Sequence, residues 1–181
     1  MMPSLRSIIE SLIFVAQEPL SLERMQQILP EYSAVDIEKA VSELEEGYLD
    51  HSRGIQIQRT GGGYLFVTRG DCDPWLKKML HMDKKTRLSS AALETLSIIA
   101  YHQPITLAEI SALRGVDASH SLKTLLLRRL VKITGRKKSP GKPLIYRTSN
   151  KFLTYFGLNS LQELPTQEEI EKLLDEQDAH V

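Results

Sequence analysis

The chain has too little cysteine for a disulfide framework or a thiolate metal cluster, because Cys72 is its single cysteine. It also lacks an apolar run long enough to cross a bilayer, and its strongest apolar runs have the length of core segments. Arg6 and Glu10 interrupt the place where the apolar part of a secretory leader would lie, so we expect none. With 181 residues, 41% of them hydrophobic, the sequence predicts a soluble cytoplasmic protein of one or two small domains.

Acidic residues are missing from a long segment, although the net charge of the whole chain is zero. Residues 118–162 carry ten basic and no acidic side chains, whereas residues 1–70 carry six basic and ten acidic ones. Residues 163–181 carry one basic and seven acidic side chains. Charge sorted in this way indicates that the parts of the chain face different surroundings.

The residue pattern also lacks a catalytic or metal site. The five histidines are scattered, without a pair at i and i+4, and none lies near Cys72 in sequence. The glycines at 61–63 stand between two expected strands, and Gly141-Lys142 is followed by Pro143 where a phosphate-binding loop needs Ser or Thr. We therefore predict that the protein is not an enzyme and binds no metal or cofactor.

Apolar spacing predicts three helices near the start of the chain. Within residues 5–16, 22–29 and 34–49, apolar residues recur at intervals of three and four, as in a helix that buries one face. The second of these helices follows Ser21, a favourable N-cap residue, and ends at Pro30.

The spacing of apolar residues then changes from the helical period of about 3.6 to the strand period of 2, which predicts a β-hairpin. Ile55 and Ile57 alternate with glutamines, and Gly61–Gly63 precede an apolar segment at 64–69. Glycines supply the positive φ that a tight turn requires. Three helices followed by a hairpin describe a winged helix, which is a helix-turn-helix core with a β wing.

The same order of elements repeats at an offset of 84 to 85 residues. Glu10, Leu12 and Ala16 recur as Glu94, Leu96 and Ala100, and the motif at 19–22 recurs at 104–107. Wing strands are expected over 131–136 and 144–148, around a turn at 139–143. An internal repeat favours two tandem units over one irregular domain.

We therefore predict a mainly α fold with small β wings, built from two tandem winged-helix domains. The N-terminal domain is expected over residues 1–83 and the C-terminal domain over 84–165. An acidic tail, 166–181, is too short to form a stable helix by itself in water, so it either frays or docks on a partner. A linking helix is expected at 73–82, with Trp75 and the residue after it packed on the first unit.

The two units differ in the charge of their third helix. In the first unit this helix, 34–49, carries five acidic residues and one lysine, and the phosphate backbone of DNA would repel it. In the second unit, basic residues lie where DNA-binding winged helices contact DNA, but the helix has no Asn or Gln to read adenine. Four alternatives stay open for this basic surface: sequence-specific reading of DNA, weak phosphate contact, contact with an acidic protein surface, or solvation. The candidate contacts are Arg129, Lys132, Arg136, Lys137, Lys138 and Lys142.

The second unit also carries an ordered series of short motifs. They are LSSAALETL at 88–96, IIAY at 98–101, QPI at 103–105, RGV at 114–116, GR at 135–136, PGKP at 140–143 and FGL at 156–158. The first unit matches more loosely, mainly at 9–14 and 18–20. Through this series, over roughly residues 5–165, the chain resembles the segregation and condensation protein B (ScpB) family.

The resemblance implies a non-enzymatic, nucleoid-associated subunit of a condensin-like complex. Such proteins bind the kleisin ScpA, are joined with the Smc ATPase through it, and act in chromosome condensation and partition during cell division. The resemblance further implies a homodimer formed by the N-terminal winged helices, with two copies on one kleisin. Contact with DNA would be indirect or weak, and no membrane contact is implied.

Two positions depart from the family pattern. Arg129 stands where family members often carry glycine, which leaves the geometry of that helix end open. The usual Thr-Thr after the wing tyrosine reads Arg147-Thr148-Ser149 here. Neither change removes a partner contact that can be named.

Winged helices present apolar grooves into which an amphipathic or extended kleisin segment can lay its apolar residues. On this basis we expect Leu127, Arg128, Ile145 and Tyr146 to lie on or near a partner-binding surface, with core packing as the alternative. The competing function is a winged-helix DNA-binding transcription regulator. It would need a basic, polar third helix in both units, and the first unit lacks one.

Overall fold

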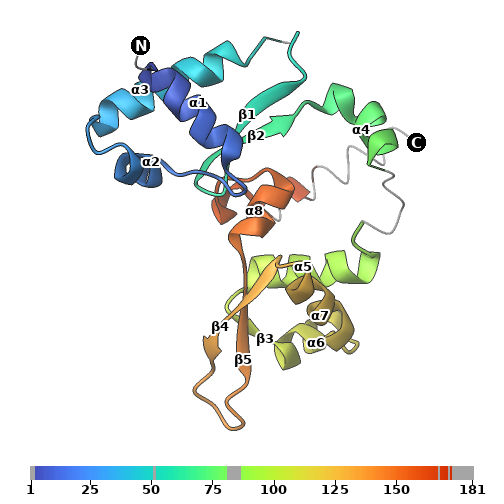
Figure 1. The fold of residues 1–181 in the computed structure, drawn as a ribbon. Helices are drawn as coiled ribbons and strands as arrows, with labels where there is room; N and C mark the ends of the chain where they lie inside the picture. Colours follow the sequence, from blue (N-terminus) through green and yellow to red (C-terminus); the bar gives the residue numbers. More distant parts are fainter. Residues whose placement is uncertain (1–2, 51, 81–86, 167, 171, 173–181) are drawn as a thin grey trace.

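Three helices and a hairpin form the first unit of the computed structural model, which describes residues 3–50, 52–80, 87–166, 168–170 and 172 (Figure 1). The elements are α1 (Leu5–Val15), α2 (Leu22–Ile28), α3 (Ala34–Gly47), β1 (Ile55–Thr60) and β2 (Gly63–Thr68). Each helix begins after a serine, Ser4, Ser21 or Ser33, whose hydroxyl accepts a hydrogen bond from the amide three residues on. The Ser21 cap expected from the sequence is therefore confirmed.

The core of the first unit forms where the apolar faces of the helices meet the wing. Its buried side chains are Ile9, Ile13, Met25, Leu29, Ile37, Ala40, Val41, Leu44 and Tyr64. Strands β1 and β2 pair antiparallel, from Ile55 opposite Thr68 to Thr60 opposite Gly63. Tyr64 also exchanges two backbone hydrogen bonds with Leu20, of 2.9 and 3.0 Å, and these join the wing to the connection between α1 and α2.

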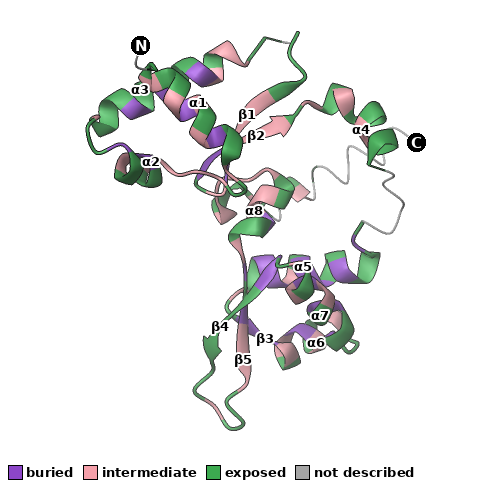
Figure 2. Cartoon of the chain, in the orientation of Figure 1, coloured by how far each residue is buried: buried purple, intermediate pink, exposed green. Residues whose placement is uncertain are grey.

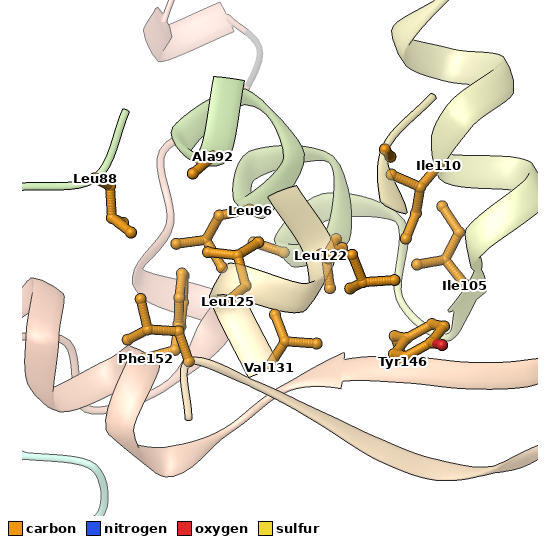
Figure 3. Packing of buried hydrophobic residues seen from close by; sticks show 14 residues of the cluster. Leu88, Ala92, Leu96, Ile105, Ile110, Leu122, Leu125, Val131, Tyr146 and Phe152 are labelled. Carbon is orange, nitrogen blue, oxygen red and sulfur yellow. The ribbon is translucent and has the colours of Figure 1, made fainter. Parts of the chain in front are cut away.

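The second unit repeats this plan and adds a strand and a helix. Its elements are α5 (Ser90–His102), β3 (Ile105–Thr106), α6 (Leu107–Arg114), α7 (Ser119–Leu127), β4 (Val131–Arg136), β5 (Leu144–Thr148) and α8 (Asn150–Phe156). The sheet has the order β3-β5-β4, with antiparallel pairs. Side chains from these helices and strands meet in a second core, seen from close by in Figure 3. The predicted fold class, two tandem winged helices with small wings, is confirmed.

One expectation about the segment between the units is wrong. The expected linking helix is present as α4 (Asp73–Met79), which follows a short turn, η1 (Gly70–Cys72). Leu76 is half-buried, but Trp75 does not pack on the first unit, because it is 68% exposed. The expected junction at residue 83 lies within 81–86, outside the described residues. Beyond the turn η3 (Leu161–Glu163), most of the acidic tail also lies outside them.

The two units touch through the residue that follows the C-cap of α8. The carbonyl oxygen of Leu158 accepts two hydrogen bonds of 2.9 Å, from the amide of Gly61 and from the hydroxyl of Thr60. Thr60 is almost fully buried, at 1% exposure. Helix α8 therefore belongs to the second unit in sequence and contacts the wing of the first, between the two helical bodies (Figure 1).

Candidate functional site

The wing of the second unit presents basic side chains on an exposed hairpin. The register places Lys132 of β4 directly opposite Arg147 of β5, so both side chains lie on the same face of the sheet. Both residues are exposed, and Figure 2 shows that most of this hairpin is exposed. Among the described residues, neither side chain forms an ion pair.

The turn of this wing holds four further basic residues close together. Arg136, Lys137, Lys138 and Lys142 line an open hollow of about 500 Å³, together with Ser139 and Pro140. Backbone bonds fix the turn: the amide of Lys137 donates to the Pro143 carbonyl at 2.8 Å, and that of Lys142 to the Ser139 carbonyl at 2.9 Å. The Arg136 guanidinium donates to the Lys142 carbonyl at 3.1 Å. The structure thus brings together four of the six basic candidates.

Glu109 neutralises part of this charge from the start of α6. Its carboxylate pairs with the ammonium of Lys137 and closes a capping box with Thr106, whose amide donates to it at 2.9 Å. The bond from Lys137, followed by the bonds from the amide and hydroxyl of Thr106, lowers the pKa of Glu109 to about 2. Glu109 therefore stays ionised at neutral pH and holds the wing against α6.

Arg129 lies away from the wing turn. It lines a different hollow, next to Pro19 and Gly61 of the first unit and Asn150 of α8. Its φ of +59° is the left-handed conformation in which glycine usually ends a helix, and its amide still donates to the Leu126 carbonyl at 2.9 Å. Arginine adopts the glycine geometry here, at a cost of roughly 1–2 kcal/mol, so this helix end keeps a glycine-type backbone.

The four expected partner-binding residues do not form one surface. Leu127, at the end of α7, is 75% exposed, and Arg128 and Ile145 are half-buried. The Arg128 guanidinium donates to the Arg87 carbonyl at 3.4 Å. Tyr146 packs in the core with 6% exposure (Figure 3), as in the alternative of core packing. Adjacent strand residues point to opposite faces, and Ile145 and Tyr146 therefore cannot share one face of the sheet.

The chain matches the family model described as "Segregation and condensation complex subunit ScpB" over residues 7–167. The chain belongs to the ScpB family. A protein named segregation and condensation protein B from Syntrophotalea carbinolica is 43% identical over 97% of this chain and 88% of its own length. Its namesake from Geobacillus kaustophilus is 44% identical over 90% of this chain and 75% of its own length.

A solved structure, titled as a dimer of the ScpB N-terminal domain complexed with ScpA peptide, is also similar to the chain. It is 30% identical, with a TM-score of 0.41, and the match covers 46% of this chain and 99% of that one. The resemblance to the ScpB family stated from the sequence motifs is thus confirmed by the family match.

Metal ligands do not gather within the part of the chain that the structure describes. No group of three or more His, Cys, Asp and Glu side chains there could hold a metal ion. A search of the same residues finds no helix that is both long and apolar enough to cross a membrane.

Exposed apolar side chains of α1 and α4 were not predicted from the sequence. Phe14 and Val15 of α1 are 72% and 75% exposed, and Trp75 and Met79 of α4 are 68% and 67% exposed. The exposure of Phe14 and Val15 could have been predicted, because both lie outside the apolar stripe that α1 buries through Ile9 and Ile13. The exposure of Trp75 and Met79 could not be predicted in this way, because residues spaced i and i+4 also form the buried face of an ordinary helix.

Proposed function

We propose that this chain is the subunit that binds the kleisin ScpA in a condensin-like Smc complex, and that it acts in chromosome condensation and partition during cell division. One observation carries the proposal: residues 7–167, which include nearly all described elements of both winged helices, match the ScpB family. Family members are described as subunits of the segregation and condensation complex.

The charge of the first unit supports a protein-binding role. In a DNA-binding winged helix the third helix enters the major groove. Here α3 exposes Asp36, Glu38, Glu43 and Glu46, and these carboxylates would face the phosphates of the duplex. We propose that the first unit, residues 1–83, forms a homodimer and that residues 84–165 form the second winged-helix domain. The remaining residues, 166–181, would be an acidic tail.

We further propose a chain without catalytic activity, located in the cytoplasm and associated with the nucleoid. The chain would act by binding other proteins, and Smc would hydrolyse the ATP of the complex. Two copies per ScpA is the proposed stoichiometry, with Smc joined through the complex.

Leu127 is the proposed apolar contact of the second unit with ScpA. This apolar side chain is 75% exposed at the end of the third helix, so it contributes little to folding and is accessible to an apolar segment of a partner. Ile145 is half-buried and Arg128 is already held by the Arg87 carbonyl, so both would border the contact rather than anchor it.

A capture assay with affinity-tagged ScpA of the same organism tests this contact. Leu127→Asp is expected to lower retention of the chain at least tenfold, because a carboxylate would be buried in an apolar contact. Leu113→Asp on α6 is the matched control, since Leu113 is 55% exposed, and it should bind like the parent protein.

Equal retention of both variants would remove Leu127 from the contact. Failure of the parent chain to bind ScpA at all would overturn the proposed function. Circular dichroism on both variants confirms that they are folded.

A further inference from the structure

We propose that the wing of the second unit binds the phosphate backbone of double-stranded DNA directly and without reading its bases. The proposal goes beyond the function proposed above, which requires contact with ScpA and leaves DNA contact indirect or weak. It rests on the placement of the basic residues of β4, β5 and the turn between them.

The turn of the hairpin extends beyond the helices of its unit (Figure 1), and most of its basic residues are exposed: Lys132, Lys138, Lys142 and Arg147. Lys132 and Arg147 face each other across the strands, an arrangement that costs stability because like charges repel. Within the described residues, Glu109 supplies the one ion pair of this wing, and it reaches Lys137 alone. The other cations of the wing keep their charge available to a ligand.

Hydrogen bonds fix the backbone of the turn from which its cationic side chains extend. Two backbone hydrogen bonds close it, and the Arg136 guanidinium binds the Lys142 carbonyl across it. Lys138 and Lys142 are exposed on this closed turn. A surface ordered before binding loses less conformational entropy when a ligand arrives, which favours even a weak contact.

The composition of the turn favours phosphate over an acidic protein segment. Protein interfaces rely on buried aromatic or aliphatic anchors and are poor in lysine. Residues 136–143 contain three lysines and one arginine, and proline is the only apolar residue type among them. Protein–DNA interfaces are, in contrast, polar and strongly positive.

Base recognition is not expected from this surface. From α7 to the end of β5, residues 119–148, the chain contains no Asn, Gln, Asp or Glu to pair with adenine or cytosine. Affinity should then be that of non-specific binding, on the order of 10⁻⁴ to 10⁻⁶ M at physiological salt, and it should fall steeply as salt is added.

Fluorescence anisotropy with the full chain and two fluorescein-labelled 30-bp duplexes of unrelated sequence tests the proposal. We expect equal affinity for the two duplexes. In Lys138→Gln/Lys142→Asn, the slope of log K against log salt should fall by about 1.8, because each lost phosphate contact removes about 0.9. Asparagine is chosen at 142 because it tolerates the positive φ of 41° found there.

Lys39→Gln/Lys78→Gln is the matched control, with the same change of charge on exposed residues of α3 and α4. It should keep the parent slope. An unchanged slope in the wing variant, or no binding of the parent chain at 50 mM salt, would overturn the proposal.

Two other results would also overturn it. Tighter binding to poly-glutamate than to either duplex would show that the wing recognises an acidic protein surface. A strong preference for one duplex would show base recognition. Because ScpA is absent from this assay, its outcome is independent of the capture assay for the proposed function.

Discussion

The carboxylate of Glu109 accepts hydrogen bonds from Thr106 and pairs with Lys137. The ionisation of Glu109 therefore affects how the free energy of unfolding depends on pH. Bonds from Lys137 and Thr106 lower its pKa from 4.5 to about 2 in the folded chain. A depressed folded pKa contributes stability that is fully present above the unfolded value and is lost as pH falls toward the folded one, here between about pH 5 and pH 2.

Glu109→Gln should therefore be less stable than the parent chain at pH 6, and the difference should narrow at pH 3. Urea unfolding of both proteins at the two pH values measures the free energies of unfolding. A difference that stays constant between pH 6 and pH 3 would mean that the charge of Glu109 does not contribute.

At the residue scale, the sequence predicted where basic side chains gather better than it predicted which apolar side chains are buried. The cations of the wing turn lie together as their spacing indicated, because a short loop keeps neighbours close. Tyr146 and Leu127 both lie in apolar segments, yet Tyr146 is buried and Leu127 is exposed. Apolar character alone does not say which residues a neighbouring element covers, and the strand register that buries Tyr146 depends on pairing with Ile105.

The wing of the first unit is held to the helices by a close backbone approach at Gly63. A Cβ atom at this position would lie 2.7 to 2.9 Å from backbone atoms of Pro19 and Leu20, which cannot move aside as a side chain can. Gly63→Ala is therefore expected to cost about 1–3 kcal/mol of unfolding free energy, in the range of an overpacked core.

The matched control is Gly70→Ala, because a Cβ there meets nothing within 4 Å. Its unfolding free energy should stay within about 0.5 kcal/mol of the parent value, as for most surface substitutions. Thermal or urea unfolding of both variants measures the difference. Equal stability of the two variants would show that the wing can move away from the α1–α2 connection.

At the element scale, period and capping residues predicted most helices and both wings. The capping box of Thr106 and Glu109 opens α6, and Ser21 caps α2. The linking helix expected at 73–82 is present as α4, but Trp75 is exposed rather than packed on the first unit, because helical spacing does not say what covers a face. Elements that lack a partner in the same chain cannot be told from core elements by their sequence period.

Within the described residues, the carbonyl of Leu158 accepts two hydrogen bonds that join the two units. Thr60→Val keeps the shape of the side chain and removes the hydroxyl donor, while the amide of Gly61 still satisfies the carbonyl. We expect a loss of about 0.5–1.5 kcal/mol and faster hydrogen exchange at the Gly61 amide. Thr68→Val, at an exposed position of the same wing, is the control and should leave that exchange rate unchanged.

Unchanged exchange at Gly61 in Thr60→Val would show that the contact between the units does not depend on this hydroxyl. Small-angle scattering of the two variants then shows whether the units keep their arrangement. If the contact between the units is weakened as expected, Thr60→Val should have a larger radius of gyration than Thr68→Val.

At the scale of the whole molecule, the internal repeat predicted two units and their order. It did not predict how they meet, because 98 residues separate Thr60 from Leu158 and no spacing rule pairs a wing turn with the end of a distant helix. Membership in the ScpB family followed from short motifs in order along the chain, and these motifs do not depend on the contact between units.

Static light scattering of the purified chain mixed with ScpA of the same organism tests whether this chain is the ScpA-binding subunit. We expect a stable complex whose mass corresponds to two copies of this chain on one ScpA. A mixture in which the two proteins keep their separate masses, while the chain binds one DNA sequence tightly and selectively, would contradict it and favour a transcription regulator.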